Sequence, residues 1–274
     1  MKARKVLCAA IAALMIASPA ALTSSAVGNE VRIFVDGSLQ LCDTFLLPGT
    51  TYVSLRQFAE RFSGARVGWN AASGTAMVTW RGMTVSTRAG DPYIEAGGRV
   101  LPCAFGVFET GGRIFVPLRP LAAFFGYSVR WVEGTRVALL SRGEPFRAAG
   151  EIYAEDEVFW LSRIISAEAE GEPLEGKLAV GTVILNRVAS PDYPDTIYGV
   201  IFDRQNGVQF TPAGSGTVYC DPGPDSVRAA KMCLEGYRTS GDILFFMNES
   251  IAESFWIKNN RAFAFSIGKH DFYA

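Results

Sequence analysis

Histidine is almost absent from this chain of 274 residues, in which His270 is the only one. Cysteines are few and scattered, and no two of them stand at CxxC spacing. Structural zinc sites combine several cysteines and histidines at short spacings. The sequence therefore predicts no metal site, and it contains no motif for another cofactor.

An excess of positive charge is also missing. The chain has 26 lysines and arginines against 27 acidic residues, which gives a formal net charge of −1 at pH 7. Binding to nucleic acids depends mainly on basic side chains that neutralise phosphates. We therefore expect no nucleic-acid partner.

Long hydrophobic runs are absent as well. The apolar segment 6–16 is shorter than the roughly 20 residues that a membrane-spanning helix needs, and no later stretch is long and apolar enough. Lys2, Arg4 and Lys5 precede this segment and small residues follow it, a pattern typical of a secretion signal. We predict a signal peptide over residues 1–26 and an exported protein, with an uncleaved N-terminal anchor as the alternative.

Four cysteines remain after the signal, and an even number in an exported protein permits two disulfides. Pairing Cys42 with Cys103, and Cys220 with Cys233, would keep each bridge inside one predicted domain. Buried free thiols are the alternative, because cysteine is often a small buried side chain.

A repeat is present in the first half of the chain. The segment YVSLRQFAERFSG, residues 52–64, precedes Trp69, and the similar segment FVPLRPLAAFFG, residues 115–126, precedes Trp131. Apolar positions recur at helical spacing in the first copy, and prolines stand near the start of the second helix. Each copy thus predicts a strand, a short helix and a strand pair, and we expect both tryptophans to pack in the core rather than stack on a ligand.

This duplicated stretch resembles the N-terminal, stalk-type domain of copper amine oxidases, and we assign it to residues 29–143. No paired acids, nucleophile motif or metal cluster recurs in it, so the resemblance implies no copper and no oxidase chemistry. We expect a binding or spacer module, whose partner would be a wall polymer or another envelope protein. Residues 144–152 contain Pro and Gly at a plausible boundary and are expected to form a linker.

A helical pattern begins at Glu155. Leu161 and Ile165 lie on one apolar face, and Glu168 continues it two turns after Leu161. Burial of a carboxylate is costly and raises its pKa, which suits a general acid; a structural hydrogen bond or salt bridge is the alternative role. A second helix is predicted over residues 174–188, and Asn186 and Arg187 at its end are expected to hold the loop 190–195.

Residues 153–274 resemble the catalytic domain of the SleB/CwlJ-type cell wall hydrolases, which include the spore cortex-lytic enzymes. The resemblance is carried by ISAEAEGEP (165–173), AVGTVILNRV (179–188), the segment 190–201, QFT (209–211), FMN (246–248) and IGKHDFY (267–273). It implies a lysozyme-like α+β domain that cleaves peptidoglycan glycan strands after N-acetylmuramic acid. The predicted fold class is therefore α+β throughout, with a module of two strand-helix-strand repeats preceding the catalytic domain.

The resemblance also implies site residues. Glu168, the first glutamate of the motif EAEGE, would be the catalytic acid. Gln209 and Phe210 would line the substrate groove, while Asn248 and His270 would lie near it or support it; a structural role is the favoured alternative for His270. The protein would act in the cell envelope or the spore cortex, or be secreted.

Two mechanisms compete for this site. Glycosidases usually need two carboxylates, and the sequence offers one well-placed acid, which favours a lytic transglycosylase whose product ends in 1,6-anhydromuramic acid. A water-using muramidase is the alternative, with Glu172, Asp192, Asp195 or Asp203 as the second carboxylate. An inactive wall-binding protein is a further alternative.

Overall fold

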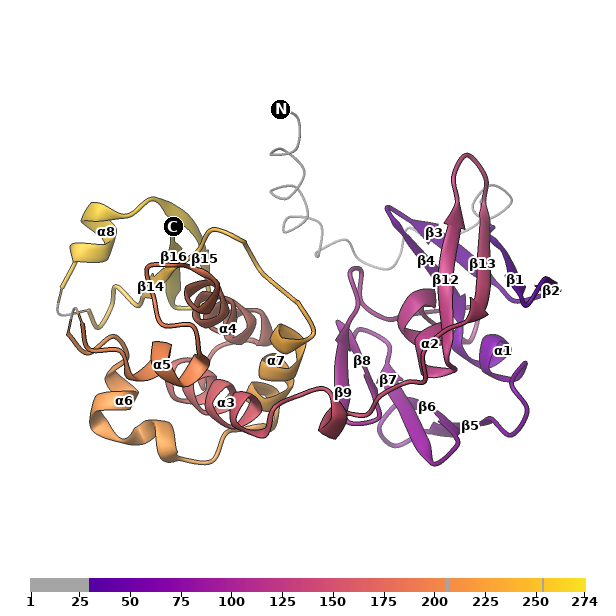
Figure 1. The fold of residues 1–274 in the computed structure, drawn as a ribbon, viewed down its shortest axis with the longest axis horizontal. Coiled ribbons are helices and arrows are strands. Elements are labelled where there is room, and N and C mark those ends of the chain that lie inside the picture. Colours follow the sequence, from indigo (N-terminus) through magenta and orange to yellow (C-terminus); the bar gives the residue numbers. More distant parts are fainter. Residues whose placement is uncertain (1–29, 206, 253) are drawn as a thin grey trace. The chain divides into compact units, whose positions relative to one another are not determined.

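The computed structural model of the protein describes residues 30–205, 207–252 and 254–274 (Figure 1). The described residues divide into two compact units, with the division between Ile152 and Tyr153. The predicted signal peptide lies outside the described residues. Within the described part of the chain, no helix has the length and apolar character needed to cross a membrane.

The N-terminal unit consists of three antiparallel or mixed sheets and two short helices. Its sheets have the strand orders β12-β13-β1-β2, β10-β11-β4-β3 and β5-β6-β7-β8-β9. Its elements are β1 (Arg32–Val35), β2 (Ser38–Gln40), β3 (Thr44–Leu47), β4 (Thr50–Ser54), α1 (Leu55–Ala59), β5 (Arg66–Asn70), β6 (Thr75–Trp80), β7 (Met83–Arg88), β8 (Tyr93–Ala96), β9 (Arg99–Pro102), β10 (Phe108–Thr110), β11 (Arg113–Pro117), α2 (Leu118–Phe124), β12 (Tyr127–Val132), β13 (Val137–Arg142) and the 3-10 helix η3 (Ala149–Glu151).

The two repeats meet at their equivalent strands. β4 leads into α1 and β11 leads into α2, and these two strands pair antiparallel with Val53 opposite Val116. Each helix is followed by a strand pair, β5-β6 in the first copy and β12-β13 in the second. The predicted strand-helix-strand order is therefore confirmed in both copies.

Aromatic side chains from both repeats fill the core of this unit. Phe58 and Phe125 are fully buried, and the ring of Phe62 stacks on that of Phe125 at 3.9 Å between centroids. The expectation for the tryptophans was right for one copy only. Trp131 is half-buried and packs against the core cluster, whereas Trp69 is 50% exposed, although both stand on edge strands, β12 and β5.

The predicted disulfides are not formed, and all four cysteines are free. Cys220 is exposed after a 3-10 helix, whereas Cys233 is buried in a helix with its thiol 3.7 Å from the carbonyl of Leu178. Burial raises the pKa of Cys103 and Cys233 to about 12, which makes both thiols unreactive. The alternative of buried thiols therefore holds for these two positions.

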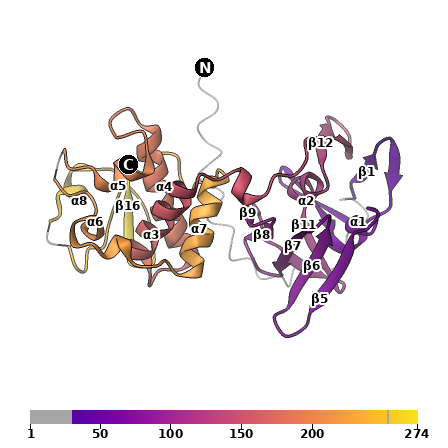
Figure 2. The ribbon, with the colours of Figure 1, turned by 60° about the horizontal axis from the view of Figure 1, so that its bottom comes forward.

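The C-terminal unit combines helices with a small sheet of order β14-β16-β15. Helices α3, α4 and α7 pack together (Figure 2). A Cβ atom at Gly181 of α4 would lie 2.8 Å from the sulfur of Cys233 on α7, so glycine permits this close approach. The elements are α3 (Glu155–Ala169), α4 (Leu174–Ala189), α5 (Ile197–Phe202), α6 (Thr211–Ser215), η4 (Thr217–Tyr219), α7 (Pro224–Leu234), β14 (Phe245–Met247), α8 (Trp256–Asn260), β15 (Phe263–Ile267) and β16 (His270–Tyr273).

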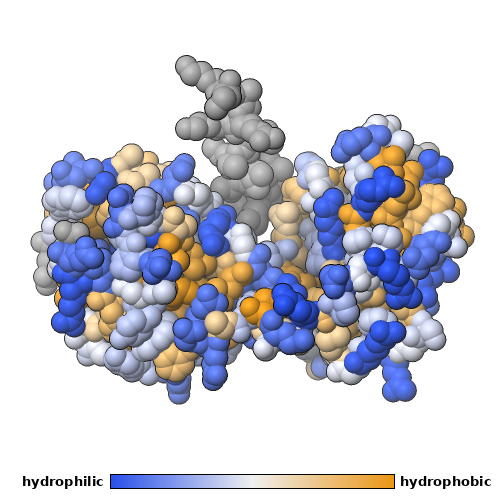
Figure 3. Space-filling view, viewed as in Figure 1, coloured by the Kyte–Doolittle hydropathy of each residue, from blue (hydrophilic) through white to orange (hydrophobic). Residues whose placement is uncertain are grey.

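The predicted α+β class is confirmed, as are both helices predicted in this unit. Leu161, Ile164 and Ile165 of α3 are fully buried, as the apolar periodicity indicated. Hydrophilic side chains cover much of the visible face of each unit, with apolar side chains between them (Figure 3).

Candidate active site

Glu168 lies in the last turn of α3, on the face that carries Leu161 and Ile165. Its side chain is half-buried, and it makes no hydrogen bond or ion pair with any residue that the structure describes. Burial raises its pKa from 4.5 to about 7. The end of a helix also disfavours an anion, so this carboxyl group retains its proton to nearly neutral pH.

The C-terminal end of α3 is capped by a buried lysine. The ammonium group of Lys177, which is 6% exposed, donates to the carbonyl oxygen of Glu170 at 2.9 Å and to that of Glu172. These carbonyls have no partner within the helix, and a cation is favoured beside them. Lys177 therefore fixes the turn that follows Glu168. Sequence reasoning missed this residue, although a lysine within an apolar helix was a signal of such a role.

Glu172 connects this turn to the hairpin of β15 and β16. Its Oε2 accepts a hydrogen bond from the backbone N–H of Lys269 at 3.1 Å, and its Oε1 lies 3.9 Å from Nδ1 of His270. Gly268 has φ +59, and a Cβ atom there would lie 1.7 Å from Oε2 of Glu172. Glycine is thus required at the hairpin turn both for its backbone angle and for the approach of the carboxylate.

His270 is the first residue of β16 in the same hairpin, and its side chain is buried. It is 7% exposed, and its ring packs edge-on against Phe246 at 5.4 Å and Phe272 at 6.3 Å. Its Nδ1 is buried without a hydrogen-bond partner in the described structure. Burial lowers its pKa despite the opposing effect of Glu172, so the imidazole is neutral at pH 7 and supports the hairpin from inside.

Arg187, at the end of α4, organises a second part of the unit. Its Nε donates to the carbonyl of Leu244 at 2.8 Å and its Nη1 to Oε1 of Gln209 at 3.3 Å. Its guanidinium also lies over the rings of Tyr193, Phe210 and Phe245, at 4.9, 5.1 and 5.3 Å from their centroids.

The prediction that Asn186 and Arg187 hold the loop 190–195 needs correction. Asn186 donates to the carbonyls of Ser240 and Ile243 at 3.0 and 2.9 Å. Arg187 contacts the loop through the Tyr193 ring and through its backbone carbonyl, which accepts from the N–H of Ser190 at 3.0 Å. Both side chains mainly hold the segment that leads into β14, because the fold brings this segment beside the end of α4.

The structure links most of the predicted site residues through direct contacts. Gln209 and Phe210 touch Arg187, the rings of Phe210 and Phe246 lie 6.3 Å apart, and Phe246 touches His270, which faces Glu172. Phe210 is 3% exposed, so it shapes the site from within. Among the described residues, Glu168 and Asn248 are not part of this chain of contacts. The carboxamide oxygen of Asn248 accepts hydrogen bonds from the N–H and hydroxyl of Ser250.

The candidate second carboxylates occupy different environments. Glu172 is 6% exposed and already holds the hairpin. Asp203 accepts a hydrogen bond from the N–H of Gln205 at 2.9 Å, and Asp192 and Asp195 are exposed in a loop. Glu168 differs from Glu172 and Asp203 in having no hydrogen-bond partner among the described residues, and burial raises its pKa to about 7, as a proton donor at pH 7 requires. The part of the chain that the structure describes contains no group of metal-ligating side chains.

Two known families match the sequence. Residues 171–273 match the cell wall hydrolase family, and residues 40–140 match the copper amine oxidase N-terminal domain. The first matched range begins just after Glu168.

Individual relatives match the same C-terminal region. A spore cortex-lytic enzyme of Oceanobacillus iheyensis is 35% identical over 130 residues, which cover 47% of this chain and 46% of that protein. The cell wall hydrolase CwlJ of the same organism is 32% identical over 109 residues, 37% of this chain and 76% of that protein. The catalytic domain of the germination-specific lytic transglycosylase SleB from Bacillus anthracis is 34% identical, with 44% of this chain and 97% of that chain covered and a TM-score of 0.41. The chain thus spans about half the length of the spore cortex-lytic enzyme that it matches.

Proposed function

We propose, from the premise that this chain belongs to the cell wall hydrolase family, that its C-terminal unit cleaves peptidoglycan glycan strands with Glu168 as the catalytic acid. The observation that carries the proposal is a half-buried carboxyl group whose pKa is raised to about 7 by burial. An acid with such a pKa is protonated often enough to donate near pH 7 and basic enough to recover a proton.

The reaction that fits one such acid is a lytic transglycosylation. Glu168 donates its proton to the glycosidic oxygen after N-acetylmuramic acid, and the bond from C1 to that oxygen breaks. The 6-hydroxyl of the same muramic acid attacks C1, and its proton returns to the Glu168 carboxylate. The products are a free hydroxyl on the leaving sugar and a 1,6-anhydro end, and no water is consumed. An internal nucleophile is effective because it is held close to C1.

The engagement of Glu172 favours this mechanism over a muramidase. A general base must be free to accept a proton from water, whereas Glu172 accepts from the Lys269 N–H and faces His270. Its role in the proposal is to position the turn after Glu168. Gln209 and Phe210 would shape the groove through Arg187, and His270 and Asn248 would support it from the hairpin and from the turn after β14.

The site of action follows from the same family relationship. Several relatives are spore cortex-lytic enzymes, and we propose that this protein is exported and acts on spore cortex or on the vegetative cell wall.

Mass spectrometry of the fragments released from purified peptidoglycan tests the proposal. The chain without residues 1–26 is compared with Glu168→Gln and, as a matched control, with Glu170→Gln, whose side chain is exposed. We expect anhydromuropeptides from the unsubstituted chain and from Glu170→Gln, and a loss of about 10²- to 10⁴-fold in rate for Glu168→Gln. Cortex and vegetative wall are digested in parallel, and the preferred material identifies the physiological substrate.

Two results would overturn the mechanism. Reducing ends in place of anhydro ends would establish hydrolysis by water and require a second carboxylate. Equal release by Glu168→Gln would remove Glu168 from the chemistry.

A further inference from the structure

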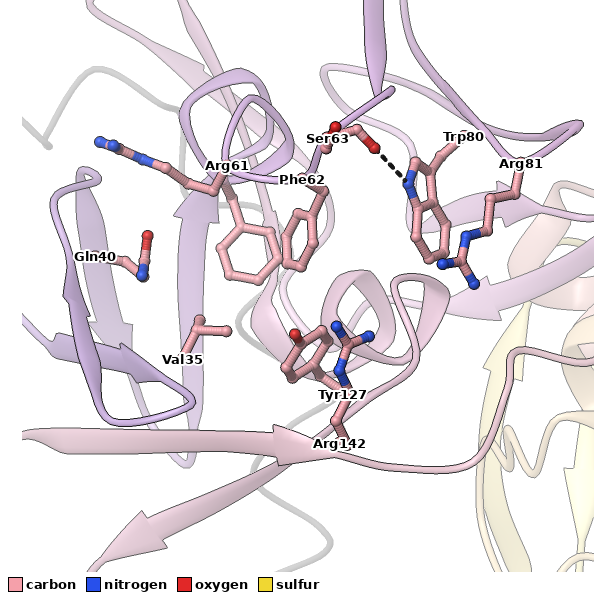
Figure 4. Close-up of a pocket in the computed structure, with 10 residues that line it drawn as sticks. Val35, Gln40, Arg61, Phe62, Ser63, Trp80, Arg81, Tyr127 and Arg142 are labelled. Atoms are coloured by element: carbon pink, nitrogen blue, oxygen red, sulfur yellow. Dashed lines mark hydrogen bonds between the residues drawn. The ribbon is translucent and has the colours of Figure 1, made fainter.

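The N-terminal unit contains a cavity of about 240 Å³ that the catalytic proposal does not use (Figure 4). It lies between β1, the end of α1, the turn from β6 to β7, and the strands β12 and β13. The residues that line it are Val35, Gln40, Phe58, Arg61, Phe62, Ser63, Trp80, Arg81, Tyr127 and Arg142.

Aromatic rings form the inner wall of this cavity. The ring of Phe62 lies 6.4 Å from that of Trp80 and 5.6 Å from that of Tyr127, between centroids. The indole N–H of Trp80 donates to the carbonyl of Ser63 at 3.2 Å, and the hydroxyl of Tyr127 donates to Oδ2 of Asp36 at 2.9 Å. The indole N–H and the phenol hydroxyl thus both have hydrogen-bond partners, which fix the orientations of the two rings.

Three arginines surround the aromatic wall. The guanidinium of Arg81 lies 4.4 Å from the ring centroid of Trp80, and that of Arg142 lies 4.7 Å from that of Tyr127 (Figure 4). Arg61 donates to the carbonyl of Leu41 at 2.7 Å. Within the described ranges no carboxylate forms an ion pair with any of the three, and the nearby Asp36 carboxylate is engaged by Tyr127. Three guanidinium groups therefore line the cavity, and among the described residues the Asp36 carboxylate is the one anion beside Tyr127, so positive charge is in excess.

Arg81, which lines this cavity, has a positive backbone φ angle. Arg81 and Asp36 are the two non-glycine residues with positive φ among those described, at 49° and 48°. Each begins a two-residue hairpin turn and precedes a glycine. Aspartate is favoured in such a position, whereas arginine is not. An unfavourable backbone angle thus holds the Arg81 side chain at the cavity, and such local strain is frequent at binding sites.

We propose that this cavity binds a single anionic sugar unit, a pyranose ring that carries a carboxylate or a phosphate. Guanidinium groups bind both anions through paired hydrogen bonds, and the partly exposed ring of Phe62 would contact the apolar face of the sugar. The volume is below the range of about 300–1,000 Å³ for drug-sized ligands, so it admits one unit rather than an oligomer. Anchoring one unit of a polymer would hold the catalytic unit near its substrate.

Two wall components share this chemistry. Muramic acid carries a lactyl carboxylate, which is anionic on units where no stem peptide is attached to it by an amide bond, and phosphate-bearing polymers accompany peptidoglycan in many walls. That the ligand comes from a wall rests on the proposed function, whereas the preference for an anionic sugar rests on the cavity alone.

The direct test measures binding of small sugars by the chain without residues 1–26, with Glu168→Gln present to prevent cleavage. N-acetylmuramic acid and N-acetylglucosamine 1-phosphate are compared with neutral N-acetylglucosamine by calorimetry or NMR. We expect an anionic sugar to bind at least tenfold more tightly than the neutral one. The double variant Arg81→Ala, Arg142→Ala should lose this preference at unchanged thermal stability, and the control Arg130→Ala, an exposed arginine of β12, should retain it. Equal affinities for anionic and neutral sugars, or an unchanged preference in the double variant, would overturn the proposal.

A second measurement identifies the source of the sugar and separates this proposal from the catalytic one. Sedimentation with whole walls is compared with sedimentation with walls stripped of phosphate polymers by hydrofluoric acid. Arginine-dependent binding to both materials assigns muramic acid, and binding to whole walls alone assigns the phosphate polymer. If the double variant binds either wall material as well as the unsubstituted protein does, the proposed binding site is wrong. The double variant with Glu168 intact should still cleave soluble glycan fragments, so a failure of binding and a failure of catalysis are distinguishable.

Discussion

The two units bury different kinds of polar group. The buried polar side chains of the N-terminal unit are hydroxyls, those of Thr44, Ser54 and Thr87, whereas the C-terminal unit also buries Lys177, Arg187 and His270. Burial of an ionisable group is costly unless it is paired or hydrogen-bonded. Here the buried groups have a positioning role, because Lys177 and Glu172 hold the turn directly after Glu168.

The difference agrees with the separate functions proposed for the two units. In the C-terminal unit ionisable groups are buried, and two of them, Lys177 and Glu172, hold the turn that follows Glu168. In the N-terminal unit the core is aromatic and the arginines are exposed around a cavity, which is the observation behind the proposed sugar site.

The largest effect is expected for Gly268→Ala. The new Cβ would overlap Oε2 of Glu172 in a left-handed backbone position, so we expect a loss of about 2–5 kcal/mol in the free energy of unfolding together with loss of cleavage. Chemical denaturation and fragment release measure the two effects.

The control for this variant is Gly236→Ala. Gly236 also has a positive φ, at +93°, but no atom lies within 4 Å of an added Cβ, so its cost should be about 1–2 kcal/mol. Adding Glu172→Ala to Gly268→Ala should recover part of the stability. Equal losses for the two glycine variants would show that contact with Glu172 is unimportant.

Lys177→Met should have the next largest effect. It removes two charge-assisted hydrogen bonds at the end of α3, and we expect a loss of about 1.5–3 kcal/mol in the free energy of unfolding and a lower kcat as Glu168 loses its position. Lys258→Met, at an exposed ion pair with Glu249, is the control and should change neither quantity. An unchanged kcat in Lys177→Met would show that this lysine does not position Glu168.

The stability of the chain should depend on the protonation of Glu168. Its folded pKa is raised from 4.5 to about 7, so the folded state retains a proton that the unfolded state releases between these pH values. The contribution of Glu168 therefore favours folding at low pH and is lost as pH rises through this interval, by at most about 1.4 kcal/mol per unit. Denaturation from pH 4 to 8 should show that Glu168→Gln lacks this loss and is the more stable protein at pH 8. Parallel curves for the two proteins would contradict the raised pKa.

The smallest effect is expected in the N-terminal unit. Thr87→Val removes a buried hydrogen bond of 3.1 Å from the threonine hydroxyl to the carbonyl of Tyr93, which should cost about 0.5–1.5 kcal/mol. Cleavage of soluble glycan fragments should be unchanged. A fall in that activity would show that the two units are not functionally separate, against the comparison made above.

Much of the fold was predictable because it depends on local patterns. The apolar periodicity of 161–165 placed Glu168 on a buried helix face, and Gly171 and Pro173 marked the end of that helix. Trp69 and Trp131 show the limit of such reasoning, since equivalent positions on two edge strands differ in burial, and only Trp131 packs against the core cluster. The cysteines were similarly ambiguous, because an even count permits bridges without bringing any two thiols together.

The amino-acid sequence by itself determined the two-part organisation, the repeat, the helix that presents Glu168 and the family of the C-terminal unit, because each depends on residues that are near one another in the chain. The tertiary structure alone decided how Glu168 is supported. The contact of Glu172 with the turn at Gly268, the capping of α3 by Lys177 and the position of Arg187 between Gln209 and Phe210 all join distant segments or depend on side-chain direction. These contacts stabilise the protein only after distant segments have come together, so a local sequence pattern does not predict them.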